Sequence, residues 1–411
     1  MNKNSSLCSF FTSHKSLKVG AFLFSTLMLS ACGGGGGGAT SATGAGSGGN
    51  AAPAPAANTL AMTVERGFDV GSSWYPNQPF VSLDICNTDM TGCITLPKVL
   101  VDTGSYGLRV FESALGPLAP SPVIHQGGEL RQCAGFGSGY TLGRIAKVGL
   151  KMAGATARDL PIQVIETSPS AAPNDCASTG TAQFTAKEQV GGNAILGIGP
   201  LASDAVAGLR VRYYVRTGNQ ISSLSPVPSD LAVPNPIVRL DQHANGVILD
   251  FPTVQASGNA THSGSLILGL NTAGNNATTG VSFLRVNDVA RLWINVGGSR
   301  YPGLIDSGSN YYHFPYRILA PCAGSIFFCP SAAQQVPMTL QDTMQSMSLG
   351  RDITIDDYQR YGTNAAQPGL AGYESGATEM ILGLPFFYGR RVYVSIQGKG
   401  AANVPAPAIG L

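Results

Sequence analysis

The sequence predicts a mainly β fold with two related lobes, and three observations support this prediction. The 411 residues include 53 glycines and 26 prolines, a proportion that favours many turns and short strands over long helices. Hydrophobic residues make up 44% of the chain and charged residues only 12%, so a core can form beneath a surface of neutral polar side chains. A four-residue motif also occurs twice, each time after an apolar segment.

Residues 1–31 have the layout of a secretory signal peptide. Lysines come first, an apolar run from Val19 to Leu29 follows, and Leu29-Ser30-Ala31 precedes Cys32. The apolar run is shorter than the roughly 20 residues that span a bilayer. The Leu-Ser-Ala-Cys sequence resembles a bacterial lipobox, which implies cleavage before Cys32 and a lipid anchor on that cysteine. An ordinary signal peptide with an incidental cysteine is the alternative.

Residues 32–58 are predicted to form a flexible Gly/Ala/Pro-rich tether. A run of glycines, 33–38, is followed by Ala, Ser, Thr and Pro, a composition that cannot bury a core. We therefore expect a protein held at the bacterial cell envelope by its lipid anchor. Gly33 rather than Asp after the anchoring cysteine favours the outer membrane. No basic tract remains beyond the signal peptide, so we expect no nucleic-acid partner.

The repeated motif indicates an internal duplication. Residues 99–105 read VLVDTGS and residues 303–309 read GLIDSGS. A strand-like apolar segment precedes each motif, and an apolar-apolar-glycine segment follows each at a distance, at residues 194–199 and 380–385. One such tetrapeptide alone would be read as a plain β-turn, since Asp and Gly are ordinary turn residues. Two in matching contexts predict two related lobes.

The duplication divides the rest of the chain into an N-terminal β lobe, residues 59–235, and a C-terminal β lobe, residues 236–411. The proline-rich segment 225–236 is the best candidate for the crossing between them.

The two repeated turns contain candidates for acid–base chemistry, Asp102 and Asp306. If the turns face each other, both carboxyl groups reach the same water molecule, and one proton is shared because like charges that close cannot both ionise. The ionised member then takes a proton from water as the water attacks a peptide carbonyl, and the protonated member hydrogen-bonds the carbonyl oxygen. This chemistry requires no metal and no cofactor.

The neighbouring residues of both turns are expected to support the two aspartates. The glycines let backbone amides approach the carboxylates, the residues between Asp and Gly hydrogen-bond across the lobe interface, and the final serines donate to the outer carboxylate oxygens. Simple turn capping is the alternative for each hydroxyl. These supporting residues are Thr103, Gly104, Ser105, Ser307, Gly308 and Ser309.

These motifs resemble those of the pepsin-like, bilobal aspartic peptidases, in a bacterial lipoprotein branch, over roughly residues 59–411. The resemblance implies that segments 194–199 and 380–385 thread beside the Asp loops and that residues 264–269 form the entry strand of the C-terminal lobe. It also implies that residues 136–150 form a flap, a β-hairpin that closes over the substrate.

The sequence departs from that family at several positions around the expected cleft. Phe136 stands where the flap usually has Tyr, and Tyr140 replaces it only under a shifted alignment. Arg109 stands where Trp is common, Tyr106 where a small residue is common, and Leu384-Pro385 where Asp often follows the second glycine. We expect Phe136, Gly137, Tyr106, Tyr311 and Tyr312 near the substrate, with packing inside the lobe as the equally weighted alternative for the aromatic residues.

The resemblance implies an envelope-anchored, monomeric endopeptidase that cleaves extended polypeptide in the groove between the lobes. The alternative is a catalytically inactive protein of the same fold that binds peptide or envelope components. A serine hydrolase is disfavoured because the chain has no Gly-x-Ser-x-Gly elbow. His313 is read as a strand or turn residue near the cleft rather than as a base.

Six cysteines remain beside Cys32 and Cys8 of the signal peptide, and an even number in an exported chain suggests disulfides. Many pairings are possible, and sequence proximity favours Cys86 with Cys93 and Cys322 with Cys329, which leaves Cys133 with Cys176. A metal site is the weaker alternative, because no pair has a Cys-x-x-Cys spacing and the histidines are scattered.

Overall fold

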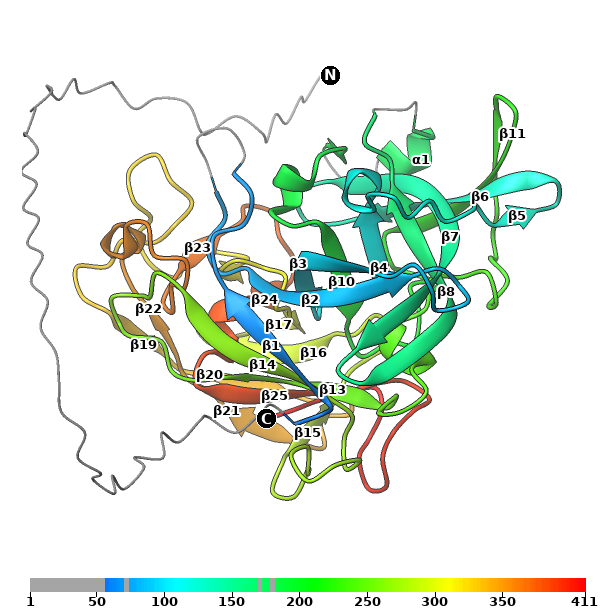
Figure 1. Cartoon of the computed structure of the whole chain (residues 1–411). Coiled ribbons are helices and arrows are strands. Elements are labelled where there is room, and N and C mark those ends of the chain that lie inside the picture. Colours follow the sequence, from blue (N-terminus) through cyan, green and yellow to red (C-terminus); the bar gives the residue numbers. More distant parts are fainter. Residues whose placement is uncertain (1–55, 70–73, 169–171, 178–181) are drawn as a thin grey trace, which may run out of the picture. The chain divides into compact units, whose positions relative to one another are not determined.

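Strands dominate the structure, a computed structural model that describes residues 56–69, 74–168, 172–177 and 182–411 (Figure 1). In these residues the one α-helix, α1 (Asn174–Ala177), is a single turn. Short 3-10 helices occur at η1 (Glu112–Ala114), η2 (Lys187–Val190), η3 (Pro236–Arg239), η4 (Tyr358–Tyr361) and η5 (Leu384–Phe387). The prediction of a mainly β fold is confirmed.

Seventeen of the described strands belong to one large sheet. From the first half of the chain it contains β1 (Thr59–Val64), β2 (Pro79–Cys86), β3 (Ile94–Asp102), β4 (Tyr106–Phe111), β5 (Ile124–His125), β6 (Gly128–Gly135), β7 (Tyr140–Met152), β8 (Ala155–Ile165), β9 (Gln183–Phe184), β10 (Ala194–Ile198), β11 (Val211–Thr217) and β12 (Gln220–Ser223). From the second half it contains β13 (Gly246–Phe251), β14 (His262–Leu268), β15 (Phe283–Arg285), β25 (Arg390–Ser395) and β26 (Ala408–Gly410).

The other described strands form a seven-stranded sheet and a separate pair. The seven-stranded sheet contains β16 (Leu292–Val296), β17 (Ser299–Ile305), β18 (Tyr312–Phe314), β20 (Met338–Gln341), β21 (Ser348–Gly350), β23 (Ala371–Tyr373) and β24 (Met380–Leu382). The pair is β19 (Gln334–Val336) with β22 (Ile353–Ile355).

Both halves of the chain repeat one strand arrangement around their Asp-Ser/Thr-Gly turns. In the first half, β10 lies parallel to β3, with Gly197 opposite Asp102, and antiparallel to β4. In the second half, β24 lies parallel to β17 and antiparallel to β18. In each half, a strand from later in the chain lies between the strand before the turn and the strand after it. Strand β10 lies between β3 and β4, and β24 lies between β17 and β18. Both central strands are apolar: β10 is buried along its whole length, and β24 is buried at Met380 and Leu382 and partly buried at Ile381.

Strand β1 joins the two halves of the chain. It pairs along its whole length with β14, from Thr59 opposite Ile267 to Val64 opposite His262, and its end also pairs with β2. In Figure 1 β1, in blue, lies beside β14, in green. The predicted division at residue 235 is therefore crossed by a strand from the N-terminal side.

The predicted signal peptide, residues 1–31, and the predicted anchor Cys32 lie outside the described residues, as does most of the tether, residues 32–58. The last tether residue, Asn58, is 3% exposed and donates a hydrogen bond to the Leu268 carbonyl oxygen at 2.9 Å. The predicted tether boundary therefore lies within the described fold at this residue. No helix in the described ranges is long and apolar enough to cross a membrane.

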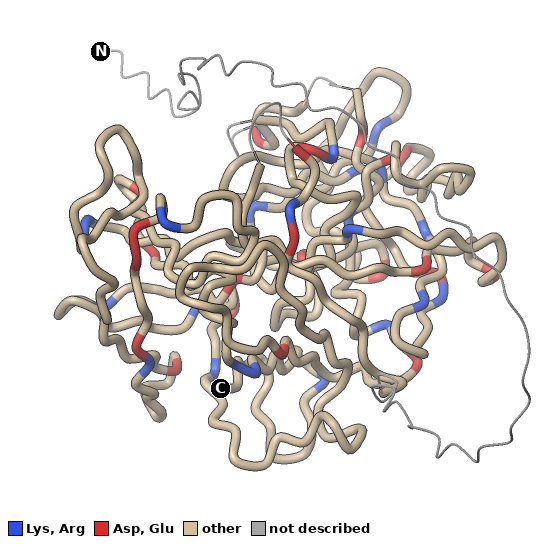
Figure 2. Tube along the Cα trace, turned by 60° about the vertical axis from the view of Figure 1, so that its left-hand side comes forward, with Lys and Arg blue, Asp and Glu red and all other residues tan. Residues whose placement is uncertain are grey.

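Charged side chains are sparse and of mixed sign along the described chain. Figure 2 shows acidic and basic residues interspersed over the trace rather than gathered into one patch of either sign. This distribution agrees with a formal net charge of only +2 for the whole sequence.

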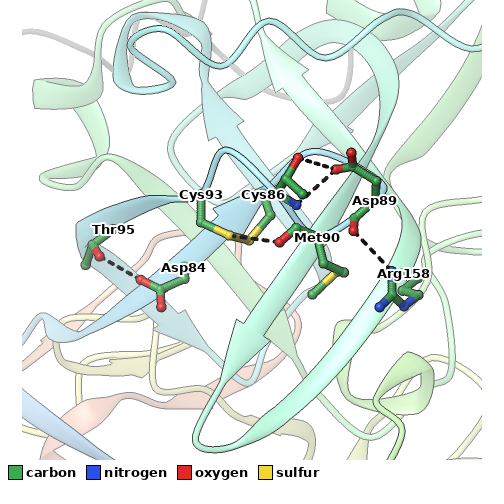
Figure 3. The surroundings of a disulfide bond; sticks show 8 residues. Asp84, Cys86, Asp89, Met90, Cys93, Thr95 and Arg158 are labelled. Carbon is green, nitrogen blue, oxygen red and sulfur yellow. Dashed lines mark hydrogen bonds between the residues drawn. A yellow bond between two sulfur atoms is a disulfide. The ribbon is translucent and has the colours of Figure 1, made fainter.

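The three favoured disulfides are present, so this prediction is confirmed. Cys86–Cys93 closes the hairpin between β2 and β3 (Figure 3). In that loop Asp89 accepts hydrogen bonds from the Thr91 amide and hydroxyl, and its carbonyl oxygen accepts one from Arg158. Cys322–Cys329 closes a second short loop, between β18 and β19.

Loss of the Cys133–Cys176 disulfide is expected to destabilise the fold the most of the three. Its cysteines are 43 residues apart and fully buried beside Tyr140 and Tyr214, whereas the other two bonds each span seven residues. Because a longer closed loop loses more entropy, replacing both cysteines with serine should lower the free energy of unfolding by about 2–4 kcal/mol. Denaturant titration beside the Cys86→Ser/Cys93→Ser variant measures the difference. An equal or larger loss in that control would contradict this ranking.

Candidate active site

Each candidate aspartate sits where a buried strand ends. Val99 and Val101 of β3 are fully buried, and Asp102 is the last residue of that strand. Asp306 directly follows β17, and its amide donates to the Leu382 carbonyl oxygen of β24 at 2.9 Å. The apolar strands hold the chain rigidly up to the polar turn, which is the support that a precise site requires.

The two turns are joined by four reciprocal hydrogen bonds. The Thr103 hydroxyl accepts from the Ser307 amide at 3.0 Å and donates to the Ile305 carbonyl oxygen at 2.9 Å. The Ser307 hydroxyl accepts from the Thr103 amide at 3.1 Å and donates to the Val101 carbonyl oxygen at 2.7 Å. Both side chains are at most 1% exposed. The two turns are thereby fixed face to face.

Each carboxylate is held by its own turn. The Gly104 amide donates to Oδ1 of Asp102 at 2.7 Å, and the Ser105 hydroxyl donates to Oδ2 at 2.5 Å. Both bonds favour the charged form of the carboxyl group. They also fix the orientation of its plane.

The second turn repeats these contacts. The Gly308 amide donates to Oδ1 of Asp306 at 2.8 Å, and the Ser309 hydroxyl donates to Oδ2 at 2.7 Å. The supporting residues predicted on both turns therefore all lie within hydrogen-bonding contact of the aspartates or of the opposite turn.

Each carboxyl group lies against the glycine of the other turn. A Cβ atom added at Gly104 would lie 2.5–2.7 Å from the carboxyl atoms of Asp306, and one added at Gly308 would lie 2.7 Å from Oδ1 of Asp102. Real Cβ atoms do not tolerate such distances, so only glycine fits at both positions. The close approach brings the two carboxyl groups together.

The environment of the pair is asymmetric. Asp102 is 6% exposed, whereas Asp306 is half-buried. Burial is the largest effect that raises the pKa of Asp102 well above its usual value, followed by the charge of Asp306. The hydrogen bonds from Ser105 and Gly104 oppose this shift only in part. Asp102 is therefore the member of the pair that retains a proton above the usual aspartate range.

A hairpin joins β6 and β7 at the start of the segment that the sequence predicts as a flap. Gly135 pairs with Tyr140, and the Phe136 amide donates to the Gly139 carbonyl oxygen at 2.7 Å, with Gly137 exposed at the tip. The Phe136 ring lies 6.4 Å from the Phe184 ring, centroid to centroid, and 5.8 Å from the Arg109 guanidinium carbon. The hairpin thus packs through Phe136 against Phe184 and against the Arg109 side chain of β4.

Tyr106 and Tyr140 belong to the interior. Tyr106 is 3% exposed in the main hydrophobic cluster, and Tyr140 packs beside the Cys133–Cys176 disulfide. Both side chains are buried: Tyr106 lies on the inward face of β4 with Leu108, and Tyr140 lies in a separate small cluster. The packing alternative therefore describes Tyr106 better than a pocket role, and Tyr140 does not stand in for Phe136.

An aromatic group follows the second turn. The Tyr311 ring stacks on His313 with 3.5 Å between ring centroids and meets Phe327 edge-on at 5.0 Å. His313 lies in β18, and its Nδ1 is 3.9 Å from the Glu374 carboxylate. Tyr312, by contrast, is 2% exposed and packs in the core. Of the two tyrosines, Tyr311 is the one near a surface.

A buried ion pair beneath the hairpin was not predicted from the sequence. Arg109 donates to the Asp204 carboxylate at 2.6 Å, and each side chain is 1% exposed. Asp204 also accepts from Tyr213 at 2.6 Å and from Gln132 at 2.8 Å. A second guanidinium nitrogen of Arg109 donates to the Tyr106 carbonyl oxygen at 2.5 Å. The pair thus links the hairpin strand β6 to the residue after Ser105.

No sequence signal marks Asp204 as the partner of Arg109. The two residues are 95 positions apart, and Asp204 stands alone among small residues in a loop. An arginine in the middle of an otherwise apolar strand signals that some acidic partner exists, because an arginine is almost never fully buried unpaired. It does not say which residue that is.

A family model matches residues 54–410 and carries the description "Protein of unknown function (DUF3443)". The chain belongs to the DUF3443 family. The match covers almost all the described residues, including both aspartate turns and all three disulfides. A search of curated proteins gives no match.

The DUF3443 match corrects the family expected from the motifs. The predicted membership in the pepsin-like aspartic peptidases is wrong: the family that matches is DUF3443, whose description names no peptidase. The motifs behind the assignment are short turns and single strands, and such local patterns recur in unrelated families. The geometry of the site must therefore support any function without the help of that family.

Proposed function

We propose that this DUF3443 protein is an aspartic endopeptidase that hydrolyses peptide bonds with Asp102, Asp306 and an activated water molecule. One observation carries the proposal. The carboxyl groups of Asp102 and Asp306 lie so close together that each leaves no room for a side chain at the glycine of the opposite turn. Hydrogen bonds of Thr103 and Ser307 across the two turns hold them in this position.

The arrangement suits general acid–base hydrolysis. Asp306, which accepts hydrogen bonds from Gly308 and Ser309, takes a proton from the water as the water oxygen bonds to the peptide carbonyl carbon. Asp102, the protonated member, hydrogen-bonds the carbonyl oxygen and stabilises the negative charge that develops there. The proton then passes to the leaving amine as the C–N bond breaks. Fixed donors cost no reorganisation during the reaction, so they favour the transition state.

We further propose that residues 59–235 and 236–411 act as two lobes related by approximate two-fold symmetry, with an extended polypeptide between them. Support comes from the repeated arrangement of β3, β4 and β10 and of β17, β18 and β24. Phe136 and Gly137 of the hairpin and Tyr311 beyond the second turn are the proposed substrate contacts. An extended chain suits such a groove because strand-like pairing supplies affinity and side-chain pockets supply selectivity.

The proposal places the enzyme in the bacterial envelope. The lipobox-like Leu-Ser-Ala-Cys sequence supports a lipid anchor on Cys32, and the glycine-rich segment after it supports a tether to the membrane. The three disulfides agree with an oxidising compartment.

Digestion of a denatured protein mixture by the purified full chain tests the proposal. We expect fragments over part of the range from about pH 3 to about pH 8, because the pair works only while it holds a single proton. A statine-type inhibitor, which imitates the tetrahedral intermediate, should block them. A folded chain that cuts nothing at any pH would contradict the proposal and favour the inactive peptide-binding alternative.

A further inference from the structure

Asn77 lies between the segment that leads into β2 and the loops around the second aspartate turn. It is fully buried, and its φ of +54° lies in the left-handed region that asparagine tolerates better than most residues. Sequence reasoning attached no role to it, because a Pro-Asn pair before a strand reads as an ordinary turn.

The Asn77 side chain uses its full hydrogen-bonding capacity. Its amide nitrogen donates to the carbonyl oxygens of Asn310 at 2.7 Å and Gln367 at 3.0 Å. Its amide oxygen accepts from the Gln367 backbone nitrogen at 2.7 Å and from the Tyr388 hydroxyl at 2.8 Å. All four contacts are with the C-terminal half of the chain. Two donors and two acceptors matched in this way leave no alternative orientation of the amide.

The contact with Asn310 leads directly to the proposed active site. Asn310 follows Ser309, whose hydroxyl donates to Oδ2 of Asp306. The Asn310 side chain in turn donates to the Pro76 carbonyl oxygen, so the two segments hold each other from both sides. The backbone at which Ser309 leaves the turn is therefore fixed by residues 76 and 77.

The same segment is also attached to the first aspartate. Gln78 donates to the Val190 carbonyl oxygen at 2.8 Å, and β2, which begins at Pro79, pairs with β3 as far as Phe80 opposite Leu100. Strand β3 ends at Asp102. Asn77 thus lies on a second connection between the two turns, separate from the bonds that Thr103 and Ser307 exchange.

We propose that Asn77 is a positioning residue for the Asp306 turn: by fixing Asn310 it keeps Ser309 in place to donate to the Asp306 carboxylate. The inference rests on the proposed function, since the turn it positions is the proposed catalytic one. Its chemical effect is to favour the charged state of the pair member that accepts the proton from water, because a lost donor makes a carboxylate harder to ionise.

Replacing Asn77 with glycine removes the side chain and keeps the backbone conformation accessible. The matched control is Asn276→Gly. Asn276 is also fully buried and makes four side-chain hydrogen bonds, to Leu268, Thr272 and Ala273 in the loop after β14. None of these partners belongs to an aspartate turn. Asn276→Gly therefore removes a buried amide with four hydrogen bonds, as Asn77→Gly does, but leaves the contacts of the Asp306 turn unchanged.

We expect Asn77→Gly to lower kcat for peptide cleavage by 10-fold to on the order of 100-fold with little change in KM, since a shift of about 1 Å in a catalytic group costs that much. The acid limb of its pH–kcat profile should move to higher pH. Asn276→Gly should keep the wild-type kcat and profile. Asn310→Ala, which removes only the bond to Pro76, should change kcat in the same direction by less, and it serves if Asn77→Gly does not fold.

Two results would overturn the inference: a folded Asn77→Gly variant with wild-type kcat and acid limb, or an equal loss of kcat in Asn276→Gly. If the wild type itself cleaves nothing, the proposed function has failed, and the pH dependence of unfolding still tests the role of Asn77. As the pH rises from about 4 to about 7, the free energy of unfolding of Asn77→Gly should then fall more steeply than that of Asn276→Gly. The reason is that the folded Asn77→Gly variant keeps a proton on its aspartate pair up to a higher pH. Parallel curves would overturn the inference.

Discussion

Asp102→Asn is expected to abolish peptide cleavage while making the folded protein no less stable at neutral pH. Asparagine has nearly the shape of aspartate: its oxygen can accept from the Gly104 amide, and its NH2 group can donate to the Ser105 hydroxyl in place of the bond that Ser105 donates now. Its amide is a far weaker acid than the protonated carboxyl group, so it stabilises the negative charge that develops on the carbonyl oxygen much less. We expect kcat to fall on the order of 10⁴-fold.

The stability of this variant follows from the direction of the pKa shift. The pKa of Asp102 is raised in the folded state, mainly by burial and next by the charge of Asp306. The folded protein therefore binds this proton more tightly than the unfolded chain, and stability falls as the pH rises from the usual aspartate range through the raised pKa. The asparagine side chain of Asp102→Asn has no proton to lose, so the variant should be more stable than the wild type above that pKa.

Peptide hydrolysis and denaturant titration on the same samples measure both effects. Asp84→Asn is a suitable control, because Asp84 lies on β2 of the same half, where its carboxylate bonds only with the exposed Thr95 among the contacts described. Cleavage by Asp102→Asn at more than a hundredth of the wild-type rate would contradict the role assigned to Asp102. A lower stability of Asp102→Asn than of the wild type at neutral pH would contradict the conclusion that ionisation of Asp102 destabilises the folded protein.

The second large effect is expected at the buried ion pair. Removing one partner by Asp204→Asn or Arg109→Met leaves the other group buried without its counter-charge, which typically costs about 3–5 kcal/mol of unfolding free energy. The pair is 1% exposed on both sides, so solvent does not screen the loss. Asp204→Asn also weakens the charged acceptor for Tyr213 and Gln132.

The double variant Arg109→Met/Asp204→Asn, measured beside the two single variants, shows whether the two losses of stability are coupled. Because both charges leave together, the loss should be smaller than the sum of the single losses by about 1–3 kcal/mol. Denaturant unfolding of the four proteins measures this coupling. Additive losses would contradict a direct pairing of the two charges.

The ion pair also predicts a pH dependence of stability that is distinct from that of the active site. Burial raises the pKa of Asp204 to about 6, against the opposing effects of Arg109, Tyr213 and Gln132. Its contribution to stability should therefore decrease as the pH rises from about 4 to about 6 and stay level above that. This part of the pH dependence should vanish in the double variant and persist in Asp102→Asn.

Local pattern predicted the strand–turn units well. Alternating or continuous apolar residues followed by Asp-Thr-Gly-Ser or Asp-Ser-Gly-Ser identify a strand and its turn, because both are determined by residues within about ten positions. The short disulfides follow the same logic, since cysteines seven residues apart can meet across one tight loop. The mainly β character came from the same kind of local information.

Long-range polar contacts could not be predicted in this way. Arg109 finds Asp204 and Asn77 finds Asn310 only after several strands have taken their places, and neither asparagine nor aspartate has a sequence signature for such a partner. The burial of Tyr106 depends on which face of β4 turns inward. The family was misassigned for a related reason: the motifs that suggested it describe two turns, not the arrangement of the whole chain.

The central claim is that Asp102 and Asp306 act as one acid–base pair, and titration of their carboxyl carbons by NMR tests it most directly. The account predicts that Asp102 keeps its proton at pH values where ordinary aspartates, with pKa values near 4, are already ionised. It also predicts that the pKa of Asp102 falls in Asp306→Asn, because the neighbouring negative charge has gone. Two carboxyl groups that titrate independently near pH 4, with no response of Asp102 to the change at Asp306, would contradict the account.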